Sequence, residues 1–234
     1  MEAMIQQKVD KWLNGNYDEA TKDAIRKMQA ENSAELTESF YRNLEFGTGG
    51  LRGIMGVGTN RMNKYTVGMA TQGYANYLKQ CFGNDVGVVV GHDSRNNSRA
   101  YAEITANVFA ANGINVYLFE ALRPTPEISF AIRELKCKGG VVCTASHNPK
   151  EYNGYKAYWD DGAQMVPPHD KNVIAEVEKI ASVDDVKWSG GEANITIIGK
   201  EMDEKYLAMV KGLSIYPDVC RAQHDLKIVY TPIH

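Results

Sequence analysis

The sequence has few cysteines and lacks any long apolar run. Its four cysteines are scattered among 234 residues and form no Cys-x-x-Cys pair, which excludes the dense disulfide framework of a small secreted domain. No stretch approaches the roughly 18 apolar residues that a membrane-spanning helix needs. The first ten residues have neither the basic region nor the apolar core of a signal peptide. We therefore expect reduced thiols, mostly in the core, and a cytoplasmic protein.

The sequence also lacks an excess of either charge. It has 26 basic and 29 acidic residues, a formal net charge of -3. A protein held mainly by phosphate backbones or anionic lipid needs a basic excess, so we expect neither nucleic acid nor a membrane as a partner. Hydrophobic residues make up 44% and charged residues 24%, which is typical of a folded globular protein of one large or two small domains.

What the sequence does contain is a helical beginning followed by alternating helices and strands. Apolar residues recur every three or four positions over residues 1–45, which predicts a helical N-terminal arm with a cap at Asn32-Ser33. The strands that follow are nearly continuous apolar runs, which indicates burial on both faces. We predict an α/β fold, a mostly parallel sheet with helices on both faces. The helices are expected over 65–80, 98–112 and 126–136, and the strands over 86–90, 115–119 and 140–144.

The later part of the chain continues the pattern and then stops. We expect a strand over 155–159, helices over 171–182 and 203–213, and a strand over 226–231. A lone buried parallel strand has little to pair with, so we interpret the chain as a fragment of a longer protein. Its predicted parts are a helical arm (1–45), an α/β domain (46–200) and the truncated start of a second α/β domain (201–234).

The glycine-rich segment 46–60 is expected to be a loop with backbone N–H groups free for a ligand. Its Gly47-Thr48-Gly49-Gly50-Leu51-Arg52 has Arg where a dinucleotide fingerprint has its third Gly, and no Gly-Lys-Ser or Gly-Lys-Thr of a phosphate-binding NTPase loop exists. Ser146 lacks the Gly-x-Ser-x-Gly turn of a serine hydrolase. The sequence therefore matches none of the common nucleotide-binding motifs and lacks the serine hydrolase motif.

Three segments follow predicted strands, where ligands of such sheets bind. They are Gly91-His92-Asp93-Ser94-Arg95, Arg123-Pro124-Thr125-Pro126 and Thr144-Ala145-Ser146-His147-Asn148-Pro149. Taken singly, each is explained equally well by turn chemistry. What remains is an exposed serine flanked by His147 and Asn148, with the cations Arg52, Arg95 and Lys156 available from other loops and N–H donors from the glycine-rich segment. Phosphoryl transfer needs these groups.

Other polar residues carry a weaker signal. His92, His169 and His224 have no ligand spacing around them, and we interpret them as structural or surface residues. Lys150 is close to Ser146 in sequence but is equally well explained as a solvated loop charge. Asp160-Asp161 is not expected to bind a metal, because adjacent carboxylates on an extended segment diverge.

Two of these segments together resemble a known family. Thr144-Ala145-Ser146-His147-Asn148-Pro149, followed by Asn153-Gly154-Tyr155-Lys156, resembles the phosphoserine loop of the α-D-phosphohexomutases, the phosphoglucomutase and phosphomannomutase family. Residues 46–53 are similar to its first active-site loop, in the form found in the phosphoglucomutase-2-like branch that handles glucose and pentose phosphates. Residues 91–95 are similar to its strand-end turn.

The resemblance implies a mutase in which Ser146 is phosphorylated and exchanges its phosphoryl group with a sugar phosphate. Arg52 would bind phosphate, Lys156 and His147 would serve proton transfer or charge stabilisation, and Asn148 would orient the loop. The sugar would pass through a sugar 1,6-bisphosphate, and Mg²⁺ would contact this chain only through the phosphate on Ser146. The implied substrate-binding residues are Thr48, Gly49, Arg52, Ser146, His147, Asn148 and Lys156.

The sequence also departs from this family. The aspartate-rich metal loop and the domains that select the sugar are absent, so we expect the fragment alone to be inactive. The alternative is a non-catalytic module of the same fold that binds or senses sugar phosphates.

Overall fold

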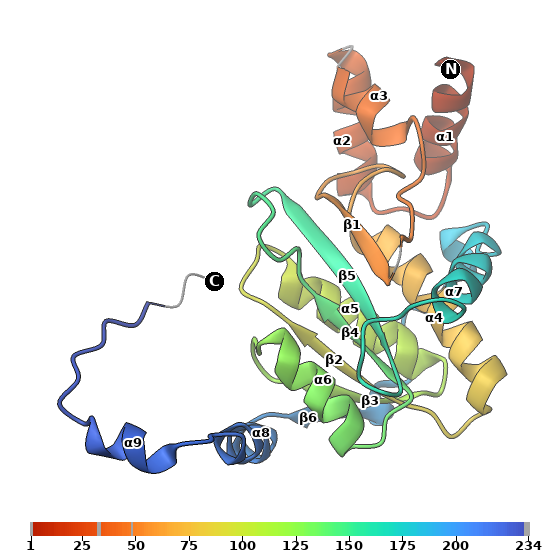
Figure 1. Ribbon diagram of the computed structural model, residues 1–234. Helices are drawn as coiled ribbons and strands as arrows, with labels where there is room; N and C mark the ends of the chain where they lie inside the picture. The colour runs from red at the N-terminus through yellow and green to blue at the C-terminus, as the bar shows by residue number, and fades with distance from the viewer. Residues whose placement is uncertain (1, 32–33, 48, 232–234) are drawn as a thin grey trace.

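The computed structural model describes residues 2–31, 34–47 and 49–231, which form a helical arm, a six-stranded sheet covered by helices, and an extended C-terminal segment (Figure 1). The strand order is β1-β5-β4-β2-β3-β6. The strands are β1 (Gly50–Ile54), β2 (Gly87–His92), β3 (Asn115–Phe119), β4 (Gly139–Cys143), β5 (Tyr152–Trp159) and β6 (Ile195–Ile198). β5 alone runs against its neighbours, so the sheet is mostly parallel, as predicted.

Helices cover both faces of the sheet, which confirms the predicted fold class. The helices are α4 (Lys64–Phe82), α5 (Ser98–Ala111), α6 (Thr125–Glu134), α7 (His169–Glu178), α8 (Lys200–Gly212) and α9 (Pro217–Ala222), with short 3-10 turns at Val183–Asp185 and Glu192–Asn194. The core beneath α4, α5 and α7 is separate from the core beneath α6 and α8. None of the helices in the described part of the chain is long and apolar enough to cross a membrane.

The N-terminal arm has its own small core. Its helices are α1 (Glu2–Asn14), α2 (Glu19–Ala30) and α3 (Ala34–Phe40). Val9, Ile25 and Phe40 are fully buried within it. Asp18 caps α2 by accepting from the backbone N–H of Thr21 (2.8 Å), and its other carboxylate oxygen accepts from the Tyr65 hydroxyl of α4 (2.6 Å). These contacts join the arm to the sheet domain; the cap expected at Asn32-Ser33 lies outside the described residues.

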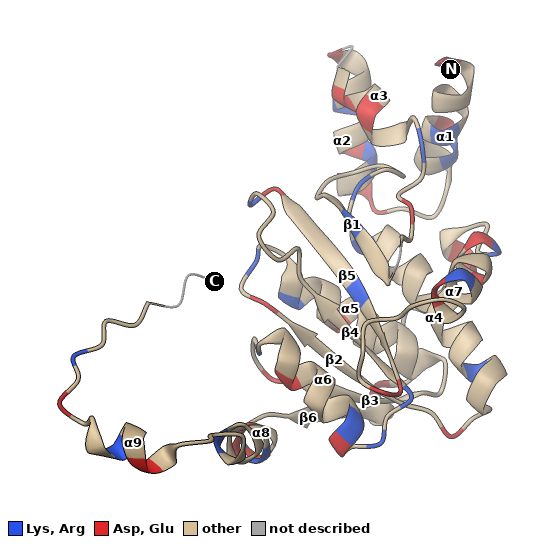
Figure 2. Cartoon of the chain, viewed as in Figure 1, with Lys and Arg blue, Asp and Glu red and all other residues tan. Residues whose placement is uncertain are grey.

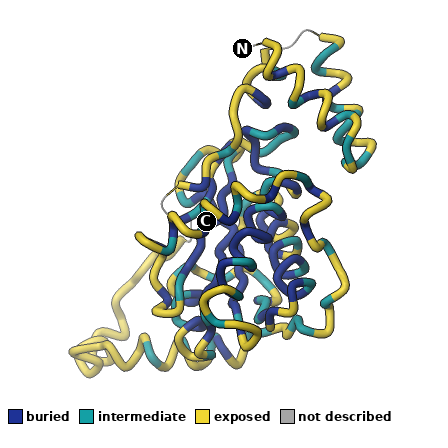
Figure 3. The backbone as a smooth tube through the Cα atoms, turned by 90° about the vertical axis from the view of Figure 1, so that its right-hand side faces the viewer, coloured by how far each residue is buried: buried dark blue, intermediate teal, exposed yellow. Residues whose placement is uncertain are grey.

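Two of the predicted local structures are wrong, and one strand was not predicted. Segment 46–60 is not entirely loop, because β1 forms there and pairs with β5, which uses backbone groups expected to be free. The expected strand over 226–231 is absent, since no neighbouring strand lies beside it in the described part of the chain and its side chains are exposed (Figure 3). β6, which pairs with β3, was not predicted in the loosened region after residue 189.

The four cysteines are free thiols, as expected. Cys137 and Cys143 are buried, whereas Cys81 and Cys220 are exposed, so only half of them lie in the core. Burial raises the pKa of Cys137 and of Cys143 to about 12. These two thiols are therefore inert structural groups.

Candidate active site

Ser146 stands just beyond the carboxyl end of β4, at a turn with a left-handed backbone. Its φ of 53° is a conformation that costs a non-glycine residue roughly 1–2 kcal/mol. The Ser146 N–H donates to the Thr144 hydroxyl at 3.0 Å, and the serine side chain is half-buried. This geometry presents the hydroxyl at the edge of the sheet where ligands of parallel sheets bind.

Arg95 holds this turn from the neighbouring strand end. One guanidinium nitrogen, Nη2, donates to the backbone oxygens of Ser146 (2.7 Å) and Asn148 (2.5 Å). The other, Nη1, donates to the backbone oxygens of Pro149 (3.0 Å) and Tyr152 (3.2 Å). The Arg95 side chain is only 10% exposed. Its donors are therefore committed to backbone carbonyls, and the expectation that Arg95 is an available phosphate cation is corrected.

Asp93 connects the ends of β2 and β4. Its Oδ2 accepts from the Thr144 hydroxyl at 2.5 Å, and its Oδ1 accepts from the Ser98 hydroxyl at 2.7 Å and from the Arg95 backbone N–H at 3.0 Å. Asn153 of β5 donates to the Ser98 hydroxyl at 3.0 Å. The turn that carries Ser146 is thus positioned by polar groups from three elements.

Lys156 of β5 reaches the serine directly. Its Nζ donates to Ser146 Oγ at 3.0 Å. Burial, and next the positive charge of Arg52, lower the pKa of Lys156, while Asp93 acts in the opposite direction. A lysine with a lowered pKa beside a serine hydroxyl is suited to move a proton to or from that oxygen.

Arg52 lies on the same face of the sheet as Lys156. Arg52 pairs with Gly154 and Gly50 pairs with Lys156 across the β1–β5 register, so the two cations are diagonal neighbours. Figure 2 shows the basic residues of these two strands on adjacent ribbons. Arg52 is exposed. Two cations beside a hydroxyl form a site for an anion such as phosphate.

The remaining predicted residues differ in position. His147 is exposed beside Ser146, and its ring has no hydrogen-bond partner among the described residues. Asn148 donates its backbone N–H to the Ala145 oxygen at 3.1 Å, and its side-chain Oδ1 is buried without a partner in the described part of the chain. Gly49 is buried, and its carbonyl accepts from the Ala157 N–H of β5 at 2.8 Å. Thr48 lies outside the described residues.

Comparison with known proteins identifies the family of this chain. Residues 43–184 match the family model described as phosphoglucomutase/phosphomannomutase, alpha/beta/alpha domain I, which is more than half of the chain. The chain belongs to this family. The matched range contains Arg52, Arg95, Ser146 and Lys156.

Relatives of this mutase-family chain are longer than it is. It is 35% identical to the phosphopentomutase of Homo sapiens over 246 residues, covering 100% of this chain and 40% of that protein. It is 34% identical to the glucose 1,6-bisphosphate synthase of Homo sapiens over 239 residues, covering 97% and 38%. The chain therefore spans about two fifths of the length of the curated relatives it matches.

A solved structure of the family has the same fold. A crystal structure from Thermus thermophilus, assigned as a phosphomannomutase, superposes with a TM-score of 0.54 and 34% identity over 58% of this chain and 30% of that chain.

No cluster of metal ligands is found in the part of the chain that the structure describes. Across residues 2–31, 34–47 and 49–231, no three His, Cys, Asp or Glu side chains gather as metal ligands. Asp160 and Asp161 are both exposed, and Asp161 accepts from the Ala163 N–H. Arg123, from the second strand-end segment, forms an ion pair with Asp203 of α8 at 2.6 Å, so it is not a free cation for a phosphate.

Sequence reasoning missed the structural roles of Asp93, Thr144 and Arg95. These residues were quoted as motif members, but their partners are backbone groups and hydroxyls up to 57 residues away. The one available signal was their position directly after buried strands. That signal locates the end of the sheet without showing which side chain binds which carbonyl.

Proposed function

We propose that this chain is the phosphoryl-carrying part of a phosphosugar mutase. Ser146 would exchange a phosphoryl group with hexose or pentose phosphates, interconverting 1-phosphates with 6- or 5-phosphates through a sugar bisphosphate. The membership of the family and the names of the relatives support a mutase. We place the phosphoserine domain at 46–200, with the arm (1–45) before it and the opening of a second domain (201–234) after it, in a cytoplasmic enzyme.

The observation that carries the proposal is the 3.0 Å contact between Lys156 Nζ and Ser146 Oγ. When the phosphoserine gives up its phosphoryl group, the Oγ–P bond breaks and Oγ takes the electron pair. Lys156 can donate a proton to that oxygen as charge develops on it. In the return step, Lys156 accepts the proton of the Ser146 hydroxyl while a new Oγ–P bond forms and the sugar oxygen leaves.

The other residues have roles that follow from their positions. Arg52 would bind phosphoryl oxygens as a planar fork of donors beside Lys156. His147 is exposed next to Ser146 and would exchange the proton of the sugar hydroxyl. Asn148, Gly49 and Thr48 are proposed to line the substrate side of the same edge.

Mg²⁺ is part of the proposal only through the phosphate on Ser146. The three nearby groups Asp93, Thr144 and Arg95 are occupied with one another, and no carboxylate cluster exists among the described residues. The donor set of this chain therefore does not fit a complete magnesium site, and no step above depends on the ion.

The experiment measures transfer of a labelled phosphoryl group from glucose 1,6-bisphosphate to Ser146, by mass spectrometry of the Ser146 peptide. It compares this chain with a chimera in which the chain replaces the matching two fifths of human phosphopentomutase. We expect no mutase turnover by this chain alone. We expect the folded chimera to carry label on Ser146, and Lys156→Met to slow labelling at least 100-fold. Lys150→Met, an exposed lysine of the adjoining loop, is the matched control.

The result that contradicts the proposal is a folded chimera that binds the bisphosphate and acquires no label. That outcome supports the alternative, a sugar-phosphate-binding module without catalysis. Equal labelling of the Lys156→Met and Lys150→Met chimeras would contradict the proton-transfer role of Lys156. It would not contradict the role of Ser146 as the phosphoryl carrier.

A further inference from the structure

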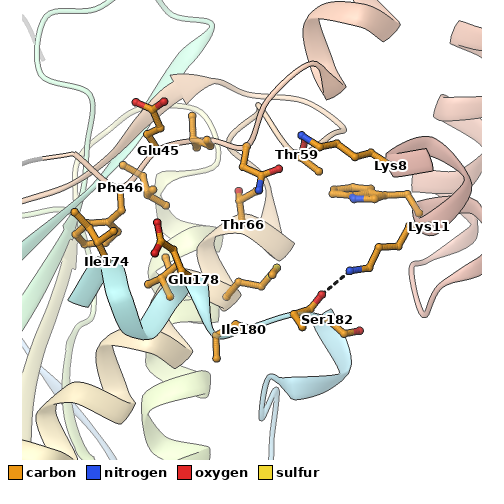
Figure 4. A pocket seen from close by; sticks show the side chains of 18 of the residues that line it. Lys8, Lys11, Glu45, Phe46, Thr59, Thr66, Ile174, Glu178, Ile180 and Ser182 are labelled. Atoms are coloured by element: carbon orange, nitrogen blue, oxygen red, sulfur yellow. Dashed lines mark hydrogen bonds between the residues drawn. The ribbon is translucent and has the colours of Figure 1, made fainter. Parts of the chain in front are cut away.

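A cavity of about 570 Å³ lies between the N-terminal arm and the sheet domain (Figure 4), and Ser146 is not among its lining residues. Its walls are α1 of the arm, α7, the start of α4, and the segment that leads into β1. The volume is within the range of small-molecule sites, roughly 300–1,000 Å³. The lining is mostly apolar, with Trp12, Leu44, Phe46, Ile174 and Ile180 among its residues.

The cavity is on the opposite face of β1 from the candidate active site. Leu51 lines the cavity, whereas its neighbour Arg52 points to the other face because successive side chains of a strand alternate. Phe46, which also lines the cavity, packs against the Tyr155 ring with centroids 6.3 Å apart. The cavity is therefore separate from the phosphate site and is divided from it by one layer of strands.

The charges of the cavity are distributed unevenly. Lys8 is half-buried and extends toward Thr59 (Figure 4). Burial lowers the pKa of Lys8, and no carboxylate lies within ion-pair distance of its ammonium among the described residues. Lys11 is already used, because its Nζ donates to the Ala181 oxygen at 2.5 Å. Glu45 and Glu178 lie on the far wall, so an anion fits only at the end that holds Lys8.

We propose that this cavity binds a small organic anion with a flat apolar body. The anionic group would pair with Lys8, and the apolar body would lie between the Trp12 ring and the side chains of Ile174 and Ile180. The Lys8 ammonium has no carboxylate partner among the described residues, so a ligand anion would gain a charge-assisted contact there. A sugar phosphate fits less well, because several of its hydroxyls would lie against the apolar side chains of Trp12, Ile174 and Ile180. The lining offers only a few hydrogen-bonding side chains in their place, such as Asn43, Thr59 and Thr66. The occupant is thus a different class of molecule from the substrate of the proposed mutase.

The test is a fluorescence titration of this chain with 8-anilinonaphthalene-1-sulfonate, which has a flat apolar body and one sulfonate. We expect saturable binding that 1-naphthoate displaces and that the uncharged 1-naphthalenemethanol displaces at least tenfold less well. Lys8→Met keeps the apolar stem of the lysine and removes its charge, so we expect it to raise the dissociation constant at least tenfold. The matched control is Lys27→Met, which replaces a lysine of α2 that is 76% exposed.

The proposal is overturned if Lys8→Met and Lys27→Met bind the probe as the original chain does. That result would place the probe elsewhere, for example on the exposed apolar side chains near the C-terminus. If Lys8→Met does not fold, Ile174→Trp provides a second test, because the larger ring fills the cavity. Loss of the saturable binding in a folded Ile174→Trp chain supports the site, and unchanged binding overturns it.

Discussion

The turn that carries Ser146 (residues 144–149) and the C-terminal segment (residues 213–231) both lie largely outside regular structure, and they differ in what surrounds them. Three of the four backbone oxygens that accept from Arg95 belong to the turn, at Ser146, Asn148 and Pro149. In the C-terminal segment Val229 is 94% exposed and Ile228 is 74% exposed. The comparison indicates that an irregular backbone is held in one conformation by hydrogen-bond donors that reach its carbonyl oxygens. Apolar side chains that have no surface to pack against do not hold the C-terminal segment in the same way.

The largest expected effect is at the chemical centre of the turn. Ser146→Ala removes the hydroxyl bonded to Lys156, so phosphoryl transfer by the chimera with human phosphopentomutase should fall at least 1,000-fold. A coupled assay of turnover, with thermal unfolding to check the fold, measures it. Ser94→Ala, an exposed serine in the neighbouring strand-end segment, is the control. Turnover within tenfold of the parent would eliminate Ser146 as the phosphoryl carrier.

Removing the donors tests the turn itself. Arg95→Met leaves four backbone oxygens without their charged partner, so we expect unfolding free energy to fall by about 2–3 kcal/mol and labelling of Ser146 to slow about 100-fold. Urea unfolding and the labelling assay measure these two quantities. Arg99→Met, on the exposed start of α5, should change neither. If labelling in Arg95→Met matches that in Arg99→Met, the turn does not depend on Arg95.

A smaller effect is expected where the well-packed part of the chain ends, at α8. Burial, and next the hydrogen bond and charge of Asp203, raise the pKa of Glu127 to about 7. Between the ordinary value of 4.5 and about 7, the folded chain holds a proton that the unfolded chain releases. Unfolding free energy should therefore decrease as pH rises through this window, by on the order of 2 kcal/mol.

Glu127→Gln should remove this decrease, since glutamine cannot lose the proton. The measurement is urea unfolding at several pH values between about 4.5 and 8, a range that spans both ends of the window. Glu120→Gln is the control because Glu120 is an exposed neighbour of Arg123. A Glu127→Gln chain with the same pH dependence as Glu120→Gln would assign the dependence to other groups.

The smallest effect is expected in the C-terminal segment. Val229→Asp puts a charge on a side chain that is already almost fully exposed, so unfolding free energy should change by less than about 0.5 kcal/mol. Val89→Ala, at a fully buried position of β2, should cost about 1–3 kcal/mol in the same urea experiment. A loss above roughly 1 kcal/mol in Val229→Asp would show that this segment packs against a surface of the chain.

Sequence patterns correctly predicted helices and strands that pack against neighbouring elements in the usual way. The strand expected over 115–119 forms over those residues, and α5 begins at Ser98 as predicted. Both have long apolar patterns that bury against neighbouring elements. β1 was missed because its glycines favour a loop, and the close pairing of Gly50 with β5 compensates for that preference. The 226–231 run has strand propensity without a strand to pair with among the described residues.

The site was predictable to a similar extent. Ser146, Lys156 and Arg52 were singled out as a serine with nearby cations, and the family resemblance supplied their expected roles. The structure brings Lys156 to the serine with Arg52 on the same face, while the roles stay predictions. The Arg95 contacts were not predictable, because a bond to a backbone oxygen leaves no trace in the identity of the residue that supplies it. Such contacts can be identified only from the three-dimensional structure of the turn.

The short sequence distance between Ser146 and Lys156 bears on the order in which the protein assembles. They are ten residues apart, because Ser146 lies in the connection between the antiparallel strands β4 and β5 and Lys156 lies in β5. Closing this short loop costs little chain entropy. Arg52 reaches the same face from a strand far earlier in the chain, and contacts of that kind form slowly. During folding, the serine and its lysine can therefore meet before Arg52 arrives, so the proposed phosphate site is completed last.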